Sequence, residues 1–410
     1  MGLETLRAKW IIPVDGRPIE GGSVSLQGGR ILAVGEDVRT DTVDLGEVAI
    51  VPGFVNAHTH LEFSALPAPL SPGLPFTDWL KRVIQYRREH PSVVRDAIQA
   101  GLKESVAGGT TLIGDIATSG WTPQDYEGAA SKGPRVVVFQ ELLGLSPERI
   151  APLCALAETH LGDDPAGPIA RRMLSPHAPY SVHPQVLDHA ISLTAPQRGR
   201  TLAMHLAETA SERELLETGG GEFRDFLQDM GVWQPDLFGG RSYGDILESL
   251  GDLPRGLIVH GNDLRDKELM RLAQFPHLTT VYCPRTHAAF GHPPHPWLTL
   301  LSLGGTVAIG TDSRASNPDL SMWNELQFLA ERFPDVPHHT LLKLGTWAGA
   351  TALGLRSDCG SLTPGKRADF AIIELRDPAF RDPNFDLFAP GNRVIGTMIG
   401  GEWAVDPTTR

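Results

Sequence analysis

The sequence predicts an α/β protein in which a closed (β/α)8 barrel, or TIM barrel, carries a small β-sandwich domain formed by both termini. Three observations predict this fold. Eight short, continuous apolar runs recur through the middle of the chain, and helical stretches separate most of them. Both ends of the chain instead contain short segments bounded by glycine and aspartate. The chain has 410 residues, whereas a barrel alone takes about 250, so a barrel with a smaller domain fits the length.

The eight apolar runs are candidates for buried parallel strands, because they are continuous and rich in β-branched residues. They lie at residues 51–57, 110–116, 135–139, 172–175, 201–204, 257–259, 279–282 and 306–310. The helices predicted between them include residues 76–89, 93–107, 211–218 and 266–273. Strand and helix alternating eight times is typical of a closed barrel. The long connection after the fifth run is expected either to cover a substrate at the catalytic rim or to be an ordinary surface loop.

The two ends of the chain predict a second, antiparallel unit. Short strands are expected at residues 10–14, 23–26, 30–34, 368–373, 393–399 and 403–405, with turns at glycine pairs between some of them. Such segments, bounded by turn residues, mark antiparallel sheets. We therefore predict a composite β-sandwich domain from residues 1–52 and 359–410, and a barrel from residues 53–358.

Composition limits the possible partners. The net charge is −13 without any block of like charge, which predicts a solvated surface that repels nucleic acid. The three cysteines, Cys154, Cys283 and Cys359, are far apart and form no CxxC pair, which favours a reducing compartment. No apolar run reaches the roughly 18 residues that a membrane span needs. We expect a cytoplasmic protein with no membrane partner.

Histidines and one aspartate follow the ends of four predicted strands. His58 and His60 follow the first, His205 the fifth, His260 the sixth and Asp312 the eighth. The strand ends of a barrel share one face, so these side chains are expected to meet there. An HxH pair alone would equally suit surface or core histidines, but burying so many unpaired polar groups is costly without a shared purpose. Neutral imidazoles with one carboxylate predict a divalent metal site, with Zn²⁺ favoured and Fe²⁺ as the alternative.

The segments 51–60, 205–209, 260–262, 310–313 and 360–369 together resemble the amidohydrolase superfamily over essentially the whole chain. Within it, the chain resembles the branch of aminohydrolases and chlorohydrolases that act on N-heterocycles, and in particular the methylthioadenosine/adenosylhomocysteine and aminodeoxyfutalosine deaminases. The resemblance implies a metal-dependent hydrolase that acts on a small heterocyclic substrate, and it suggests a homo-oligomer.

The resemblance also implies the roles of individual residues. The implied metal ligands are His58, His60, His205 and Asp312. Asp312 would also take a proton from the attacking water, while His260 would hold or shuttle that proton or act as a fifth ligand. Glu208 would be the general acid/base, since a side chain three residues beyond a strand end can reach over the metal. The alternative for Glu208 is a first-turn carboxylate that stabilises the following helix.

The fourth predicted strand ends without the lysine that bridges two metals in binuclear members, which favours a mononuclear site. His177 follows this strand between two prolines, and the resemblance gives it a hydrogen bond to the heterocycle; the alternative is an ordinary loop histidine. Arg285 and His287 follow the seventh strand and add positive charge to the rim. Arg285 would clamp a substrate carboxylate bidentately or pair with an acidic loop. Trp79, with its neighbour Phe76, would form an apolar wall over the substrate or pack in the core.

The expected reaction is hydrolytic deamination, which releases ammonia from an aminated N-heterocycle, with an adenosine-like nucleoside as the candidate substrate. A chlorohydrolase and a cyclic amide hydrolase on the same scaffold are the alternatives. Glu208 favours ammonia release, because a departing amine needs a proton, and the missing lysine disfavours cyclic amides. A non-catalytic binding protein is the second alternative, and it is disfavoured because none of the implied ligands is lost.

Overall fold

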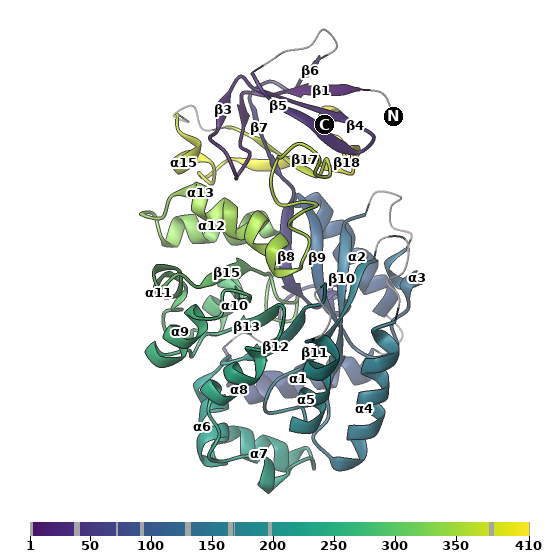
Figure 1. Ribbon diagram of the computed structural model, residues 1–410, viewed down its shortest axis with the longest axis vertical. Coiled ribbons are helices and arrows are strands. Elements are labelled where there is room, and N and C mark those ends of the chain that lie inside the picture. Colours follow the sequence, from purple (N-terminus) through teal and green to yellow (C-terminus); the bar gives the residue numbers. More distant parts are fainter. Residues whose placement is uncertain are drawn as a thin grey trace.

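The computed structural model of the protein describes residues 3–36, 42–70, 73–90, 94–127, 133–162, 167, 169–195, 199–376 and 381–409. Val93, at the start of a predicted helix, lies outside the described residues, as do residues 1, 2 and 410 at the ends of the predicted β domain. The chain forms a large barrel and a smaller β domain that contains both termini (Figure 1).

Eight parallel strands form the barrel sheet and follow one another in sequence order. They are β8 (Phe54–Thr59), β9 (Thr110–Ala117), β10 (Arg135–Leu142), β11 (Ile169–Pro176), β12 (Leu202–Leu206), β13 (Gly256–His260), β14 (Leu278–Tyr282) and β15 (Thr306–Ile309). The backbone N–H of Asp312 donates to the carbonyl of His58 at 3.1 Å, which brings the first and last strands together. The predicted barrel is therefore confirmed.

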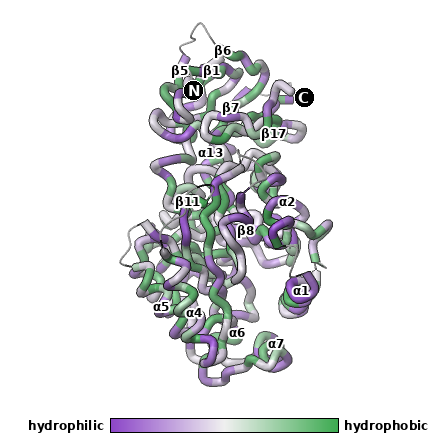
Figure 2. Tube along the Cα trace, turned by 90° about the vertical axis from the view of Figure 1, so that its right-hand side faces the viewer, coloured by the Kyte–Doolittle hydropathy of each residue, from purple (hydrophilic) through white to green (hydrophobic). Residues whose placement is uncertain are grey.

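Helices surround the barrel and extend its loops, and the last of them lies between two strands of the small domain. They are α1 (Phe76–Glu89), α2 (Val94–Ala107), α3 (Pro123–Tyr126), α4 (Pro147–His160), α5 (Pro184–Thr194), α6 (Ala210–Thr218), α7 (Glu222–Asp229), α8 (Tyr243–Leu250), α9 (Asp266–Ala273), α10 (Pro284–Ala289), α11 (Trp297–Ser302), α12 (Met322–Arg332), α13 (His338–Lys343), α14 (Gly349–Ala352) and α15 (Pro383–Asp386). Those around the barrel carry hydrophilic as well as hydrophobic residues, as expected for helices with one face on the core (Figure 2). None of the helices in the described ranges combines the length and the apolar character that a membrane crossing requires.

Two sheets build the smaller domain, in the orders β5-β4-β1-β6 and β18-β17-β16-β7-β2-β3. Their strands are β1 (Glu4–Arg7), β2 (Trp10–Ile11), β3 (Ile19–Glu20), β4 (Ser23–Gln27), β5 (Arg30–Gly35), β6 (Thr42–Asp44), β7 (Val48–Pro52), β16 (Phe370–Glu374), β17 (Arg393–Ile399) and β18 (Glu402–Val405). Leu6 and Val24 of the first sheet share one buried cluster with Ile50, Phe370 and Met398 of the second. Strands from both termini thus share one core, as predicted.

The apolar run at residues 51–57 is not one strand. It divides at Gly53, so that β7 belongs to the small domain and β8 to the barrel. A Cβ atom at Gly53 would lie only 2.2 Å from Oγ1 of Thr111, so the chain passes from one domain to the other where only glycine fits.

The barrel interior is packed with side chains. One buried cluster takes at least one residue from every barrel strand, from Val55 in β8 through Phe139 in β10 to Ala308 in β15. Leu353, which follows α14, belongs to the same cluster. Because side chains fill the barrel, a substrate can enter only at the strand ends.

Candidate active site

Three barrel strands end in a left-handed turn at a residue other than glycine. Ala207 follows β12 with φ 57°, His260 ends β13 with φ 72°, and Asp312 lies three residues beyond β15 with φ 56°. Such a conformation costs on the order of 1–3 kcal/mol per residue and clusters at functional sites. All three turns lie at the carboxyl ends of the strands, where barrels carry their chemistry.

Three imidazoles converge at this end of the barrel. His58, His60 and His205 are buried, and one nitrogen from each lies within 4.8 Å of the others. Nε2 of His60 is 3.3 Å from Nε2 of His205. Oδ1 of Asp312 is 3.6 Å from Nε2 of His58 and 4.0 Å from Nε2 of His60. The structure therefore brings together all four residues that the resemblance implied as metal ligands.

The donor set fits a divalent cation. Both ring nitrogens of His58 are buried and have no hydrogen-bond partner among the described residues. Burial, followed by the neighbouring imidazoles, lowers the pKa of His60 and of His205 well below the usual value, so both rings are neutral. Nδ1 of His205 lies 3.0 Å from the carbonyl oxygen of His177 and donates to it, which leaves Nε2 with a free lone pair. Neutral imidazoles oriented in this way are typical metal ligands.

The turn that carries Asp312 is held on both sides. Oγ1 of Thr59 donates to the carbonyl oxygen of Asp312 at 2.7 Å, and Oγ of Ser316 donates to its Oδ2 at 2.6 Å. Burial alone would raise the pKa of Asp312, but the nearby His58 and His260 imidazoles outweigh it and lower that pKa below the usual value. The carboxylate is thus kept ionised within reach of the imidazoles.

Glu208 and His260 face each other beside this cluster. Nε2 of His260 lies 3.3 Å from Oε1 of Glu208, and both side chains are almost fully buried. Burial, with the charges of Asp312 and Glu212 as smaller contributions, raises the pKa of Glu208 well above the usual value. The two neighbouring carboxyl groups, Glu208 and Asp312, thus have pKa values shifted in opposite directions, an arrangement that separates a proton donor from a proton acceptor.

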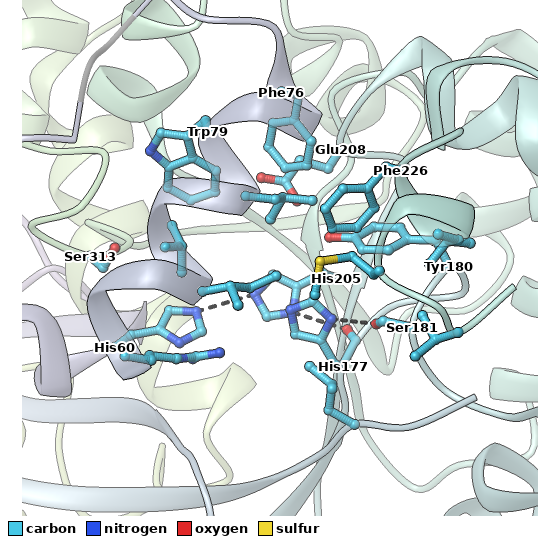
Figure 3. A pocket seen from close by; sticks show the side chains of 18 of the residues that line it. His60, Phe76, Trp79, His177, Tyr180, Ser181, His205, Glu208, Phe226 and Ser313 are labelled. Carbon is cyan, nitrogen blue, oxygen red and sulfur yellow. Dashed lines mark hydrogen bonds between the residues drawn. The ribbon is translucent and has the colours of Figure 1, made fainter. Parts of the chain in front are cut away.

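A cavity of about 210 Å³ opens over these groups. The polar part of its lining includes His60, His205, His260, Glu208 and Asp312. Much of the remaining lining is apolar and comes from the η1 turn (Leu61–Phe63), α1, the loop after β10, and α7 with the residues after it. Figure 3 shows the aromatic rings of this apolar part on one side of the cavity and the imidazoles on the other. The cavity is therefore suited to a flat, largely apolar molecule with one polar edge.

His177 and Trp79 both line the cavity. Nδ1 of His177 is 2.5 Å from Oγ of Ser181, and its Nε2 is 3.8 Å from Oε1 of Glu141 (Figure 3 shows the first contact). Burial, followed by the charge of Arg87, lowers the pKa of His177 to about 3, so its ring is neutral. Trp79 donates from Nε1 to the carbonyl oxygen of Ala315 at 3.2 Å, which fixes the indole as part of the apolar wall.

Arg285 does not take the position predicted for a substrate clamp, and it is not among the residues that line the cavity. Its Nη1 and Nη2 donate to the two carboxylate oxygens of Asp319 at 2.7 and 2.9 Å. Nη1 also lies 3.8 Å from Oε1 of the fully buried Glu325. The bidentate pair is intramolecular, so the structure has the acidic-loop partner that the sequence left open as the alternative.

Replacement of Arg285 by alanine is therefore expected to lower stability without changing substrate preference. Asp319 and Glu325 would lose the guanidinium but keep their other hydrogen-bond donors, so the free energy of unfolding should fall by about 1–3 kcal/mol. Arg271→Ala is the control, because its ion pair with Glu248 is exposed to solvent and is expected to add little to stability. Denaturant unfolding measures both effects. A KM raised only for carboxylate-bearing substrates in Arg285→Ala would contradict this assignment.

His287 also points away from the predicted rim position. Its Nε2 donates to the carbonyl oxygen of Pro293 at 2.9 Å, and its ring packs edge-on against Tyr282 and His295. His287 is not among the cavity-lining residues. Its hydrogen bond to Pro293 stabilises the loop after α10, and its ring does not face the cavity.

Arg87 lines the cavity but was missed from the sequence. It donates to Oε1 of Glu62 from Nη2 at 2.6 Å, and its Nη2 lies 3.5 Å from Oε2 of Glu141. The helical spacing of α1 could have indicated it, because Phe76, Leu80, Ile84 and Arg87 lie on one face of the helix and all line the cavity. Tyr180 and Phe226 also line the cavity, and neither follows a barrel strand directly, so the rule of strand ends could not find them.

The chain is similar in sequence and in fold to several known proteins. The chain is 31% identical to the 5-methylthioadenosine/S-adenosylhomocysteine deaminase of Moorella thermoacetica, with 94% of this chain and 88% of the relative covered. It is 28% identical to the aminodeoxyfutalosine deaminase of Nitratiruptor sp., with 80% and 79% covered. The crystal structure of Helicobacter pylori aminofutalosine deaminase in complex with methylthio-coformycin has a TM-score of 0.85 at 23% identity, covering 98% of this chain and 100% of that chain.

The atrazine chlorohydrolase of Arthrobacter aurescens, complexed with zinc, shares the fold with a TM-score of 0.77 at 20% identity, covering 98% of this chain and 95% of that chain. The model of the amidohydrolase family matches residues 49–404, a range that includes the whole barrel and the last strands of the small domain. With that match over most of its length, the chain belongs to the amidohydrolase family.

Proposed function

We propose that the protein is a metal-dependent hydrolytic deaminase that releases ammonia from an aminated N-heterocycle, with an adenosine-like nucleoside as its substrate. One observation carries the proposal: three buried imidazoles converge with Asp312, and two of them line a cavity together with Asp312 and Glu208. The relatives support it, since the Moorella protein is a 5-methylthioadenosine/S-adenosylhomocysteine deaminase and the Nitratiruptor protein an aminodeoxyfutalosine deaminase.

The metal ligands in this proposal are His58, His60, His205 and Asp312, and the cation is Zn²⁺, with Fe²⁺ as the second candidate. Nitrogen donors with a single carboxylate suit these borderline ions better than Mg²⁺ or Ca²⁺. When bound, such an ion acts as a Lewis acid that activates water at neutral pH.

The side chains of the protein then move the protons. The oxygen of a water molecule forms a bond to the ring carbon that bears the amine, and Asp312 takes a proton from that water. Glu208 gives a proton to the adjacent ring nitrogen, then takes the proton of the new hydroxyl group and passes it to the departing amine. The C–N bond breaks, ammonia leaves and the ring carbon becomes a carbonyl, while the proton on Asp312 returns to Glu208 for the next turnover. His260, 3.3 Å from Glu208, orients that carboxyl group and shares its proton.

The remaining side chains of the cavity would bind the substrate and orient its ring toward the catalytic residues. His177 would bond the heterocycle through Nε2, because its Nδ1 is already engaged by Ser181. Trp79 and the other apolar side chains of α1 would pack against the flat ring and against an uncharged substituent. Arg87 is paired with Glu62 and Glu141, so its charge is already compensated.

An ammonia-release screen tests this proposal. Purified, metal-loaded protein is expected to release one ammonia per molecule of methylthioadenosine, adenosylhomocysteine or adenosine consumed, with kcat/KM of at least about 10⁴ M⁻¹s⁻¹ for the preferred nucleoside. Guanine, cytosine and an aminated triazine serve as comparison rings, and the chelator-treated protein is the control. Chloride release from a chlorinated triazine without ammonia from any nucleoside would overturn the proposal in favour of a chlorohydrolase.

A further inference from the structure

The turn that carries Glu208 is conformationally strained. Ala207, the residue before Glu208, has φ 57°, a left-handed conformation that a residue with a Cβ rarely adopts. Ala207 is fully buried and Glu208 is 5% exposed, so solvent does not compensate the backbone of this turn. Groups of the protein must therefore hold the turn and determine where the Glu208 carboxylate lies.

All four backbone polar groups of the turn are bonded. The N–H groups of Ala207 and Glu208 donate to the two carboxylate oxygens of Glu212, at 3.1 and 2.9 Å. The carbonyl of Ala207 accepts from the N–H of Asp263 at 2.8 Å, and the carbonyl of Glu208 accepts from Nδ2 of Asn262 at 3.0 Å. One buried carboxylate thus satisfies both donors, and the loop after β13 satisfies both acceptors.

Glu212 is not acting as an ordinary helix cap. It lies in the first turn of α6, whose N-cap is Thr209, and Oγ1 of Thr209 accepts from the N–H of Glu212 at 3.2 Å. In a capping box the glutamate at this position would bond the N-cap residue's own N–H. Here its carboxylate reaches past Thr209 to the two residues before it. Burial raises the pKa of Glu212, and these two N–H donors oppose that shift because they stabilise the charged carboxylate.

The same helix is bonded to the loop after β13 and to α9, which follows that loop. Nε of Arg213 donates to Oδ2 of Asp263 at 2.6 Å, and its Nη1 donates to Oε1 of Glu268 at 2.8 Å. The start of α6, the turn at Ala207 and the loop after β13 are therefore one bonded unit, and Glu208 and His260 both project from it.

We propose that Glu212 is a positioning residue, whose buried carboxylate holds the left-handed turn at Ala207 and thereby places the Glu208 carboxyl group beside His260 in the cavity lining. The inference rests on the proposed function in one respect, which is the proton-transfer role of Glu208. Glu212 is not a cavity-lining residue, so it reaches the site through the backbone of the turn and, as a smaller effect, through its charge, which helps to raise the pKa of Glu208.

Glu212→Gln tests the inference with little change of shape. The amide keeps one acceptor oxygen, but its NH₂ group would face a backbone N–H, so the turn is expected to shift. A displacement of about 1 Å at a catalytic group can lower the rate roughly 100-fold, so we expect kcat to fall about 10- to 100-fold while KM stays within about threefold. The metal content per chain should not change. Glu214→Gln, on the exposed face of the same helix, is the matched control and should behave as wild type.

Asn262→Ala provides a second variant, because it removes the bond to the Glu208 carbonyl from the opposite side. It is expected to lower kcat by a smaller factor. Since both residues hold the same turn, the double variant should lose less than the product of the two single losses. A lower Tm for Glu212→Gln with an unchanged kcat per metal-loaded chain would overturn the inference, because a merely structural role has that signature.

Hydrogen exchange separates this inference from the proposed function. The amides of Ala207 and Glu208 should exchange faster in Glu212→Gln than in wild type or Glu214→Gln, whatever substrate the enzyme takes. Unchanged exchange at these two amides would overturn the inference even if the protein proves to be a deaminase. Conversely, a wild-type protein that releases no ammonia from any nucleoside, yet shows the faster exchange in the variant, would contradict the proposed function and support the role of Glu212 in the turn.

Discussion

Replacement of His205 by alanine is expected to abolish tight cation binding and to lower kcat by at least about 1,000-fold. His205 supplies one of the three imidazole nitrogens that lie within 4.8 Å of one another, and the carbonyl of His177 already orients its ring. Loss of a group that only orients a ligand typically lowers metal affinity 10- to 100-fold, so loss of a ligand itself should have a larger effect. Elemental analysis should find close to one Zn or Fe per wild-type chain and below about 0.1 in the variant.

His339→Ala is the matched control, because His339 is exposed on α13 and should not affect metal content. Thermal unfolding with and without a chelator gives a second readout. A cation that binds only the folded protein stabilises it, so chelation should lower the Tm of wild type but not of His205→Ala. A variant that retains one tightly held ion per chain would show that the three imidazoles do not form the metal site.

Much of the fold was predictable because strand and helix patterns differ in period. α1 and α9 have the predicted bounds, since their apolar residues recur at the helical spacing. The predicted domain boundary after residue 52 lies beside Gly53, but the break in the predicted strand 51–57 was missed, because the apolar run continues through Gly53 and only the approach of Thr111 shows that a side chain cannot fit there. The long connection after β12 proved to contain α7 and α8, whose apolar faces were hidden in a stretch rich in glycine.

The candidate site likewise contains residues that the sequence could predict and residues that it could not. The histidines and Asp312 could be brought together from sequence, because the ends of parallel strands meet at one face of a barrel. The partner of Arg285 could not be inferred, because its guanidinium could pair equally well with a substrate carboxylate or with Asp319, which lies 34 residues downstream in the sequence. The turn at Ala207 was also not predicted, because alanine rarely adopts a left-handed conformation and the sequence gives no sign that it does so here.

Replacement of Glu208 by glutamine is expected to lower kcat for deamination by about 10³- to 10⁴-fold, with the metal retained. The amide has nearly the same shape, but it cannot transfer a proton, and general acid–base catalysis contributes up to about 10⁴ in rate. The metal should be retained, because Glu208 contacts His260 and not one of the three converging imidazoles, which are those of His58, His60 and His205. Steady-state kinetics and elemental analysis on the same preparation measure the two effects, with Glu214→Gln as the control.

The same variant also distinguishes deamination from displacement of chloride. An amine leaves only after it gains a proton, whereas chloride leaves as an anion and needs none. If Glu208 carries that proton, Glu208→Gln should slow ammonia release from an aminated ring far more than chloride release from the chlorinated ring of the same structure. An equal loss on both substrates would mean that Glu208 acts before the leaving group departs, on the attacking water or the ring nitrogen alone. A near-normal rate on the aminated ring would leave the buried carboxyl group, 3.3 Å from His260, without a part in the chemistry.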